Sequence, residues 1–264
     1  MKLRITSDVH TEFYRPNEIS DLVKSALPEL PDDSDTTLIL AGDIGSMHKP
    51  NNIVSFVDIV AKRFGRVLYI PGNHEFYGGD LISTPKNIQD LLAHHENVMF
   101  TACGSVRRNV SDKNDARVRD FHMATLWTDM DKEDPHMMGR AKQGMNDYRH
   151  IRCGERLAHP KDTVSLHRQM LEMLDGIQEG DVVITHHLPT LESIDNGYRT
   201  SDMNGAYASD LKGFIIKKKP ALWFNGHSHT AYDQMVGETR LIRNPLGYPH
   251  ETNYDYKPEL TVEV

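Results

Sequence analysis

Residues 67–75, with the sequence VLYIPGNHE, place the strongest constraint on how this chain can fold. The first four residues are apolar and favour β structure, which predicts a short strand buried on both faces. A Pro-Gly pair ends the strand, and Asn73, His74 and Glu75 follow at once. Polar side chains at the carboxyl end of a buried strand are typical of functional sites in α/β proteins. The alternative is an N-cap and a polar loop leading into a helix near Asp80.

Four further apolar segments end in the same way. Residues 2–6, 37–41, 181–185 and 221–224 are short and β-prone. The polar residues that follow them are Asp8 and His10, then Asp43, then His186 and His187, and finally His227 and His229 in the sequence GHSH. Five unrelated helix caps would not repeat this pattern of metal-binding residue types after apolar strands, so the pattern predicts a metal site. Imidazole, carboxylate and amide groups without thiolates suit Mn, Fe, Zn or Ni better than Ca or a Cys-rich structural zinc.

Strands and helices alternate in the first part of the chain. Residues 51–64 carry apolar side chains at helical spacing between two predicted strands, which indicates a parallel core with right-handed crossovers. The ends of the first three strands are then expected on one rim. Further helices are predicted at 19–26, 81–93, 166–174 and 210–217, strands at 98–100, 121–126 and 260–264, and a hairpin at 232–236 and 239–243. We interpret the mixed-charge stretch 107–120 as a solvated hairpin.

Residues 127–162 are expected to be irregular, because Pro135, Gly139, Gly144 and Pro160 interrupt any period. Long irregular segments inside compact domains are often functional, so we interpret this one as a lid or a substrate-facing loop. No internal repeat and no convincing linker divides the chain. We therefore expect a single domain over residues 1–264.

Charge and cysteine content narrow the possible partners. The 264 residues carry a formal net charge of −8, which argues against broad nucleic-acid or membrane-surface binding. An anionic substrate stays possible, because bound cations can reverse the local charge. The two cysteines give no disulfide framework, and neither a signal-peptide core nor an apolar run of membrane-spanning length occurs. We expect a cytoplasmic protein without a membrane partner.

The ordered motifs D-x-H, G-D, G-N-H-E, a His after a strand and G-H-x-H occur across residues 8–229. Together they resemble the calcineurin-like metallophosphoesterase family, in particular its compact bacterial single-domain members. The resemblance implies a four-layer α/β/β/α sandwich with two mixed β-sheets and a metal site at the carboxyl ends of the central strands. It also implies a hydrolase acting on a small phosphoester.

The resemblance assigns roles to individual residues. It implies that Asp8, His10 and His229 hold one divalent ion, that Asn73, His186 and His227 hold a second, and that Asp43 bridges both. His186 is preferred to His187 as the ligand. His74 would stay off the metals and act on the leaving oxygen, and Glu75 would support the site by orienting an imidazole. Two ions, with manganese expected first, would share a hydroxide that attacks the phosphorus.

Departures from the family pattern bear on the substrate. Many relatives have Asp three residues after the bridging one, where this chain has Ser46, so that contact is lost or replaced. No Arg follows Asp43 before Arg63, which disfavours a protein phosphatase. We expect a phosphodiesterase for a nucleotide-derived small molecule, with Tyr77, Asn146, Arg149 and His150 as candidate substrate contacts. The alternatives are a phosphomonoesterase or protein phosphatase, a nuclease, and a non-catalytic metal-binding scaffold.

Overall fold

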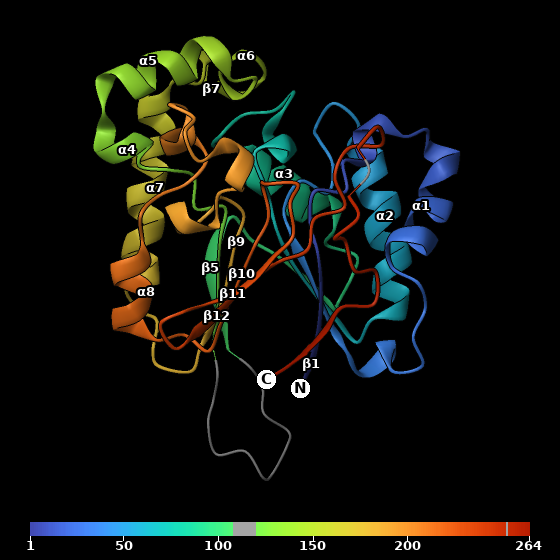
Figure 1. Ribbon diagram of the computed structural model, residues 1–264. Coiled ribbons are helices and arrows are strands. Elements are labelled where there is room, and N and C mark those ends of the chain that lie inside the picture. The colour runs from blue at the N-terminus through green and yellow to red at the C-terminus, as the bar shows by residue number, and fades with distance from the viewer. Residues whose placement is uncertain (108–119, 252) are drawn as a thin grey trace.

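The computed structural model describes residues 1–107, 120–251 and 253–264 (Figure 1). The stretch that we interpreted as a solvated hairpin, residues 107–120, lies outside the described residues except for its two ends. Within the described ranges, no helix combines the length and the apolar character needed to cross a membrane.

The first sheet has the strand order β13-β1-β2-β3-β4. Its parallel strands are β1 (Lys2–Thr6), β2 (Thr37–Ala41), β3 (Arg66–Ile70) and β4 (Val98–Phe100). The edge strand β13 (Thr261–Glu263) runs antiparallel to β1. This confirms the predicted parallel core, and it places the ends of β1, β2 and β3 at one edge of the sheet.

The second sheet has the order β11-β12-β10-β9-β6-β5. Its strands are β5 (Cys103–Arg107), β6 (Asp120–Ala124), β9 (Val182–Thr185), β10 (Leu222–Asn225), β11 (Tyr232–Val236) and β12 (Thr239–Arg243). The four inner strands are parallel, whereas β5 and β11 are antiparallel to their neighbours. The predicted hairpin at 232–243 is therefore present as the β11–β12 edge.

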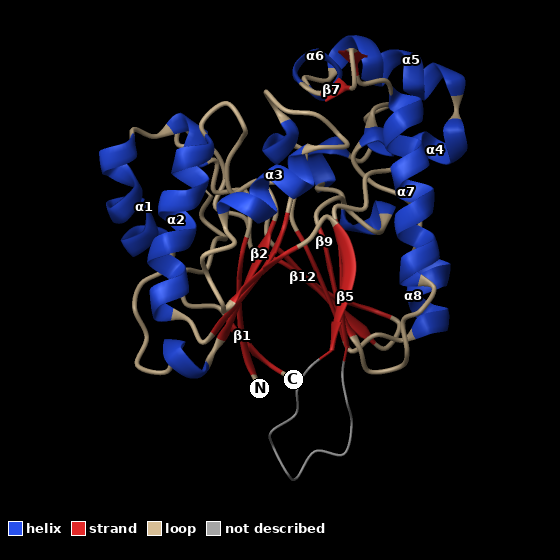
Figure 2. Ribbon diagram, turned by 180° about the vertical axis from the view of Figure 1, so that it is seen from behind, coloured by secondary structure: helices blue, strands red, loops and turns tan. Residues whose placement is uncertain are grey.

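Helices cover the outer face of each sheet (Figure 2). The first sheet is covered by α1 (Ile19–Ala26), α2 (Pro50–Arg63) and α3 (Thr84–Leu91), and the second by α7 (Pro160–Leu174) and α8 (Lys212–Lys218). Side chains alternate along β2, so Leu38 and Leu40 pack with the helices while Ile39 and Ala41 face the second sheet. The predicted four-layer sandwich with two mixed sheets is confirmed.

The expectation of an irregular segment at 127–162 was wrong. This segment contains α4 (Met130–Glu133), α5 (Pro135–Gly144), α6 (Asp147–His150) and a small hairpin of β7 (Arg152–Cys153) and β8 (Arg156–Leu157). Three of the four residues that we interpreted as breakers mark boundaries instead: Pro135 and Pro160 are the first residues of α5 and α7, and Gly144 is the last of α5. The fourth, Gly139, lies inside α5 without interrupting it. Proline fits the first turn of a helix because its missing N–H has no partner to lose there.

Candidate metal centre and cleft

The two sheets meet at the edge where their central parallel strands end. The Asp8 amide after β1 donates to Gly42 O at 3.0 Å, and the Gly226 amide after β10 donates to His186 O at 3.1 Å. The His227 amide then crosses between the sheets and donates to Asp8 Oδ1 at 3.0 Å. The loops that carry the predicted ligands are thus held together by hydrogen bonds from backbone amides, and the Asp8 carboxylate accepts the one that joins the two sheets.

Potential metal ligands form three overlapping groups at this edge, each with its donor atoms within 4.8 Å of one another. The groups are Asp8, His10 and His229; His10, Asp43 and His74; and Asp43, His186 and His227. Asn73 Oδ1 lies 3.2 Å from His186 Nε2 and adds an amide oxygen to the last group. The structure therefore brings the predicted ligands together, and Asp43 connects the groups. His187 belongs to none of them, since its Nδ1 lies 3.2 Å from Thr125 O.

The hydrogen bonding of the imidazoles fits a metal centre. His186 Nδ1 donates to Ala41 O at 2.8 Å, which leaves the lone pair of Nε2 facing Asp43. Nε2 of His227 is buried and has no hydrogen-bond partner in the part of the chain that the structure describes. Burial beside His187 and His186 holds the pKa of His227 well below its usual range. Nε2 of His10 and of His229 lie only 3.2 Å apart. Buried nitrogens of this kind need a ligand, and divalent transition ions bind such a set of imidazole, carboxylate and amide groups.

The backbone at the centre is strained. Asp8, His10, Asp43 and His227 have φ values of 54°, 53°, 54° and 72°. The left-handed conformation costs a non-glycine residue roughly 1–2 kcal/mol. Strain of this kind persists where the surrounding structure enforces it, and it clusters at functional sites. Here it turns the side chains that follow three different strands towards one point.

Gly72 permits the close approach of the loops. A Cβ atom at this position would lie 2.1 Å from Asp43 Oδ1 and 2.6 Å from His186 Nε2, in the middle of the candidate centre. The Pro-Gly pair that ends β3 therefore does more than terminate a strand. It leaves space for the atoms of the proposed bridging carboxylate.

Glu75 has contacts other than those we expected. Its carboxylate accepts hydrogen bonds from the amides of Asp43 at 2.9 Å, Ile44 at 2.7 Å and Gly72 at 2.7 Å, and from the Tyr69 hydroxyl at 2.8 Å. These contacts hold the loop after β2 and the loop after β3. Glu75 thus positions the backbone that carries Asp43 and does not orient an imidazole, because its hydrogen-bond donors are backbone amides and the Tyr69 hydroxyl.

His74 lies beside this centre with a partner that the sequence did not reveal. Its amide donates to Asp43 Oδ1 at 2.8 Å, and its Nδ1 lies 2.8 Å from Glu12 Oε1. Burial opposes the charged ring, but Asp43 and Glu12 raise the pKa of His74 to about 9. Ser46, in contrast, is buried with a hydroxyl that has no hydrogen-bond partner among the described residues. Glu12 is therefore the carboxylate that pairs with the His74 ring, and the only sequence signal was its position two residues after His10.

Asp147 is a second residue that sequence analysis missed. It is buried and accepts hydrogen bonds from Asn73 Nδ2 at 2.9 Å and from the Tyr77 hydroxyl at 2.6 Å. Because Nδ2 is engaged in this way, Asn73 Oδ1 faces His186. The Tyr77 ring stacks on His74 with centroids 4.3 Å apart. Asp147 therefore fixes both a proposed ligand and the neighbour of His74.

A cleft of about 920 Å³ opens over the centre. Of the predicted site residues, Asp43, Asn73, His74, Tyr77, Asn146, His227 and His229 line it. Arg149 and His150 lie outside the lining, and both are exposed. The Arg149 guanidinium donates to Gln143 O, and the His150 ring lies 5.6 Å from that of Tyr77 between centroids. The lining includes Tyr198, Tyr207 and Tyr248, and no Lys or Arg occurs among its described residues.

Tyr248 closes one side of the centre and was not among the predicted site residues. Its ring centroid lies 4.3 Å from that of His10 and 4.5 Å from that of His229, and its hydroxyl lies 3.4 Å from His74 Nε2. The signal in the sequence was only the Pro-Leu-Gly-Tyr stretch near the C-terminus. Tyr248 therefore covers the rings of His10 and His229, and its hydroxyl lies beside Nε2 of His74.

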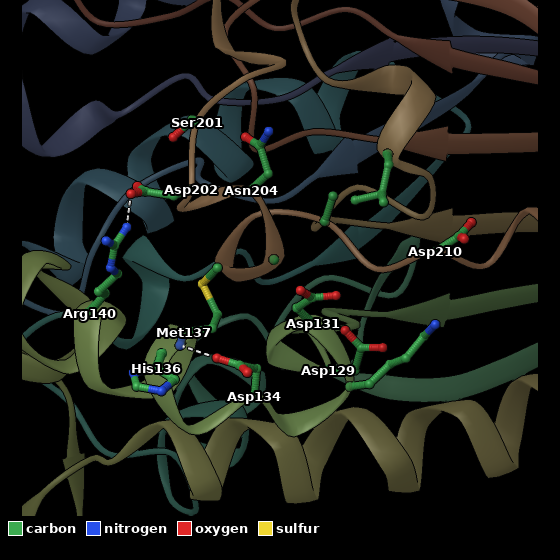
Figure 3. A pocket seen from close by; sticks show the side chains of 14 residues that line it. Asp129, Asp131, Asp134, His136, Met137, Arg140, Ser201, Asp202, Asn204 and Asp210 are labelled. Carbon is green, nitrogen blue, oxygen red and sulfur yellow. Dashed lines mark hydrogen bonds and ion pairs between the residues drawn. The ribbon is translucent and has the colours of Figure 1, made fainter.

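A second cavity of about 590 Å³ lies between α5 and the loop around residues 201–210 (Figure 3). Its lining is rich in carboxylates, and the Arg140 guanidinium pairs with Asp202 across it. None of the predicted site residues lines this cavity. Those predicted site residues that line a cavity therefore all line the larger cleft.

Comparison with known proteins agrees with this arrangement. The family model described as calcineurin-like phosphoesterase matches residues 1–231. The chain is 24% identical over 280 residues to uncharacterized protein L509 of Acanthamoeba polyphaga mimivirus, which covers 99% of this chain and 96% of that protein.

Two solved structures share the fold. The phosphopantetheinyl hydrolase of Mycobacterium tuberculosis has a TM-score of 0.69 at 15% identity, covering 94% of this chain and 90% of that one. TT1561 of Thermus thermophilus has a TM-score of 0.50 at 14% identity, covering 92% and 88%. With a family model spanning most of its length and its ligand groups gathered at one edge, the chain belongs to the calcineurin-like phosphoesterase family.

Proposed function

We propose that this chain is a dinuclear metal-dependent phosphodiesterase acting on a small molecule. The observation that supports this most directly is the convergence of the ligand groups on Asp43, beside His74 and under an open cleft. In this proposal Asp8, His10 and His229 hold one ion, Asn73, His186 and His227 hold the other, and Asp43 contacts both. Manganese is the ion that we favour, with iron, zinc and nickel as alternatives.

Two divalent ions, when bound, lower the pKa of an attacking water and neutralise charge on the phosphoryl oxygens. The chain itself handles the leaving group. His74 is held protonated by Asp43 and Glu12, and its Nε2 faces the cleft near the Tyr248 hydroxyl. It therefore donates a proton to the departing oxygen, a contribution of typically about 10²–10⁴-fold. Glu12 and the Tyr77 ring keep the imidazole in place for that transfer.

The charge of the cleft favours a diester over a monoester. A monoester is a dianion at neutral pH, and a bidentate Arg is the side chain best suited to bind its extra charge. The described lining of the cleft contains no Arg or Lys, so a monoanionic diester suits it better. The tyrosines of the lining offer flat apolar surface to a nucleobase or a similar ring. The same lack of basic side chains in the described lining argues against a nuclease, because a nuclease binds the nucleic-acid backbone in a groove lined by such side chains.

A turnover panel tests the proposal. Bis(p-nitrophenyl) phosphate, p-nitrophenyl phosphate, cyclic nucleotides and an oligonucleotide are assayed with Mn²⁺, Ni²⁺ or Zn²⁺. We expect kcat/KM to be highest for a diester. Faster hydrolysis of the monoester would support a phosphomonoesterase or protein phosphatase, and oligonucleotide cleavage that falls steeply with salt would support a nuclease.

Replacing His74 separates an enzyme from a metal-binding scaffold. We expect His74→Asn to lose turnover by at least about 100-fold, in line with general acid catalysis, while its metal content stays at the wild-type value. Turnover equal to that of the wild type would remove His74 from the proposed mechanism. No turnover of any phosphoester by the wild type itself would favour the scaffold.

We also propose that residues 1–264 act as one domain in the cytoplasm, and that residues 127–162 close over the cleft. Asn146 and Asp147 of that segment already line the cleft. Slower amide hydrogen exchange of residues 127–162 on adding inorganic phosphate to the manganese-loaded protein would support the closure, and unchanged exchange would contradict it.

The proposed cytoplasmic location has its own test. Cys103 and Cys153 form no disulfide within the described residues, so a cytoplasmic location predicts that both are found as free thiols in fresh cell lysates.

A further inference from the structure

Three side chains with metal-binding atoms converge on the outer helical layer, away from the cleft. Asp58 belongs to α2, and His94 and His95 lie in the turn after α3. Asp58 Oδ1 is 3.0 Å from His94 Nε2 and 2.7 Å from His95 Nε2, and the two rings lie 4.0 Å apart between centroids. The three donor atoms lie within 4.8 Å of one another, the same criterion that the groups around Asp43 meet.

The turn that carries the two histidines is fixed independently of their rings. Asn97 Nδ2 donates to Ala61 O at 2.8 Å and to Phe64 O at 2.9 Å, which ties the turn to the C-terminal end of α2. The His95 amide donates to Leu92 O at 3.1 Å, and Leu92 is buried in the core that α2 also helps to form. The rings are thus held over Asp58 by the backbone and the core, and a ligand would need little reordering to bind.

Ion pairing by itself explains this cluster poorly. The side chains of His94 and Asp58 are 54% and 38% exposed, and exposed pairs contribute about 0–1 kcal/mol. Asp58 Oδ1 is also the shared partner of both imidazoles. If both rings are protonated, two cations lie side by side, whereas a single cation between the three groups would accept a lone pair from each.

We propose that Asp58, His94 and His95 form a surface site for a divalent transition ion, best suited to Zn²⁺, that joins α2 to the turn after α3. Two imidazole nitrogens with one carboxylate oxygen are a ligand set that Zn²⁺ accepts, whereas Mg²⁺ and Ca²⁺ prefer oxygen ligands throughout. The exposure of His94 leaves the fourth position to water. None of the three residues lines the cleft or belongs to the ligand groups around Asp43, so this ion would be structural.

Counting bound zinc tests the site. The full chain is dialysed to equilibrium against micromolar Zn²⁺, and the metal per chain is measured. We expect the wild type to bind one ion more than Asp58→Asn and than His94→Gln, whose side chains are too exposed for the changes to unfold the protein. His48 is exposed and belongs to none of the ligand groups found among the described residues, so His48→Gln is the matched control. It should bind as many zinc ions per chain as the wild type. Equal counts in all four proteins would overturn the proposal.

Hydrogen exchange provides a second measurement that does not depend on the total count. Zinc should slow amide exchange in residues 92–97 of the wild type, and the zinc concentration needed should rise at least about tenfold in Asp58→Asn, as expected for the loss of one of three ligands. No zinc-dependent slowing in the wild type would contradict the site, whatever the cleft binds.

Discussion

The contact between Glu12 and His74 joins two loops that lie 62 residues apart in the sequence. Glu12 Oε1 also lies 3.2 Å from Nδ1 of His10, so one carboxylate oxygen contacts both a proposed ligand and the proposed acid. Its other oxygen is buried and has no hydrogen-bond partner within residues 1–107, 120–251 and 253–264. At the scale of single residues, Glu12 is therefore the side chain on which the geometry of His74 depends most.

Glu12→Gln should lower kcat by about 10–100-fold, the usual effect of losing a residue that orients a catalytic or ligating histidine. The amide keeps the size of the side chain but loses its negative charge, so it holds the protonated His74 less firmly. Metal content should stay near the wild-type value, because no proposed ligand is removed. The measurement is steady-state turnover with metal analysis, and the exposed Glu29→Gln is the control. An unchanged kcat would exclude this role.

Gly72→Ala should abolish metal binding and turnover together. The new methyl group would overlap Asp43 Oδ1 and His186 Nε2, and backbone and core surround the site too closely to shift. Gly139→Ala in α5 is the matched control, because no atom of the described residues lies within 4 Å of its added Cβ. It should keep full activity and raise the free energy of unfolding by about 0.5–1 kcal/mol, the usual gain for Ala over Gly in a helix. Wild-type metal affinity in Gly72→Ala would show that the space is not needed.

At the scale of elements, the boundaries of α5 and α7 show how local signals can be misread. The Asp134 carboxylate accepts a hydrogen bond from the Met137 amide at 2.7 Å and caps α5 immediately before Pro135. A proline after a capping residue indicates a helix start as well as a break. In contrast, four consecutive residues of α4 have φ between 52° and 66°, a left-handed turn without glycine that no propensity predicts.

His167 joins α7 to the end of the central sheet and should make stability depend on pH. The ring is buried, and its Nδ1 donates to Leu126 O at 2.8 Å. Burial lowers the pKa of His167 below its ordinary 6.5. The unfolded chain therefore takes up a proton as the pH falls below 6.5, while the folded chain stays neutral until its lower pKa is reached. Over that window the free energy of unfolding falls with decreasing pH, by at most about 1.4 kcal/mol per pH unit.

Urea unfolding at several pH values between about 7.5 and 5 checks this expectation. His167→Gln retains a donor for Leu126 O but has no group that titrates there. Its free energy of unfolding should fall less than that of the wild type as the pH decreases. Parallel curves for the two proteins would show that His167 is not the cause.

At the scale of the whole molecule, the proposed metal centre would join the two sheets. The proposed ligands before residue 80 follow strands of the first sheet, and those after residue 180 follow strands of the second. An ion held between them binds the folded state and not the unfolded one, so it stabilises the fold by about 2.7 kcal/mol when its concentration is 100 times its Kd. Removing metal should therefore loosen the contact between the sheets.

Chelation of the manganese-loaded protein with EDTA should lower Tm by several degrees, since 1 kcal/mol shifts Tm by about 2–4 °C in proteins of roughly this size. His186→Gln, which lacks one proposed ligand, should show a smaller shift. His48→Gln should show the full one. Differential scanning calorimetry measures all three, and a wild-type Tm that ignores EDTA would contradict a metal held between the sheets.

The sequence by itself determined the strands that carry the candidate ligands, the parallel order of the first strands and the edge at which those candidate ligands gather. Apolar periodicity and turn residues act locally, and parallel strands with right-handed crossovers must end on one rim. The pattern of the chain was therefore enough to place the ligand residues after β1, β2 and β3 together. The order of the motifs then indicated the family.

Only the tertiary structure decided which side chains surround that edge. It brought Glu12, Asp147 and Tyr248 to His74 and its neighbours, and it left Arg149 and His150 outside the cleft. These contacts join residues 62 to 174 positions apart through loops with strained or irregular backbone. Local propensity carries no information about such loops, because their conformations are fixed by packing against the rest of the molecule.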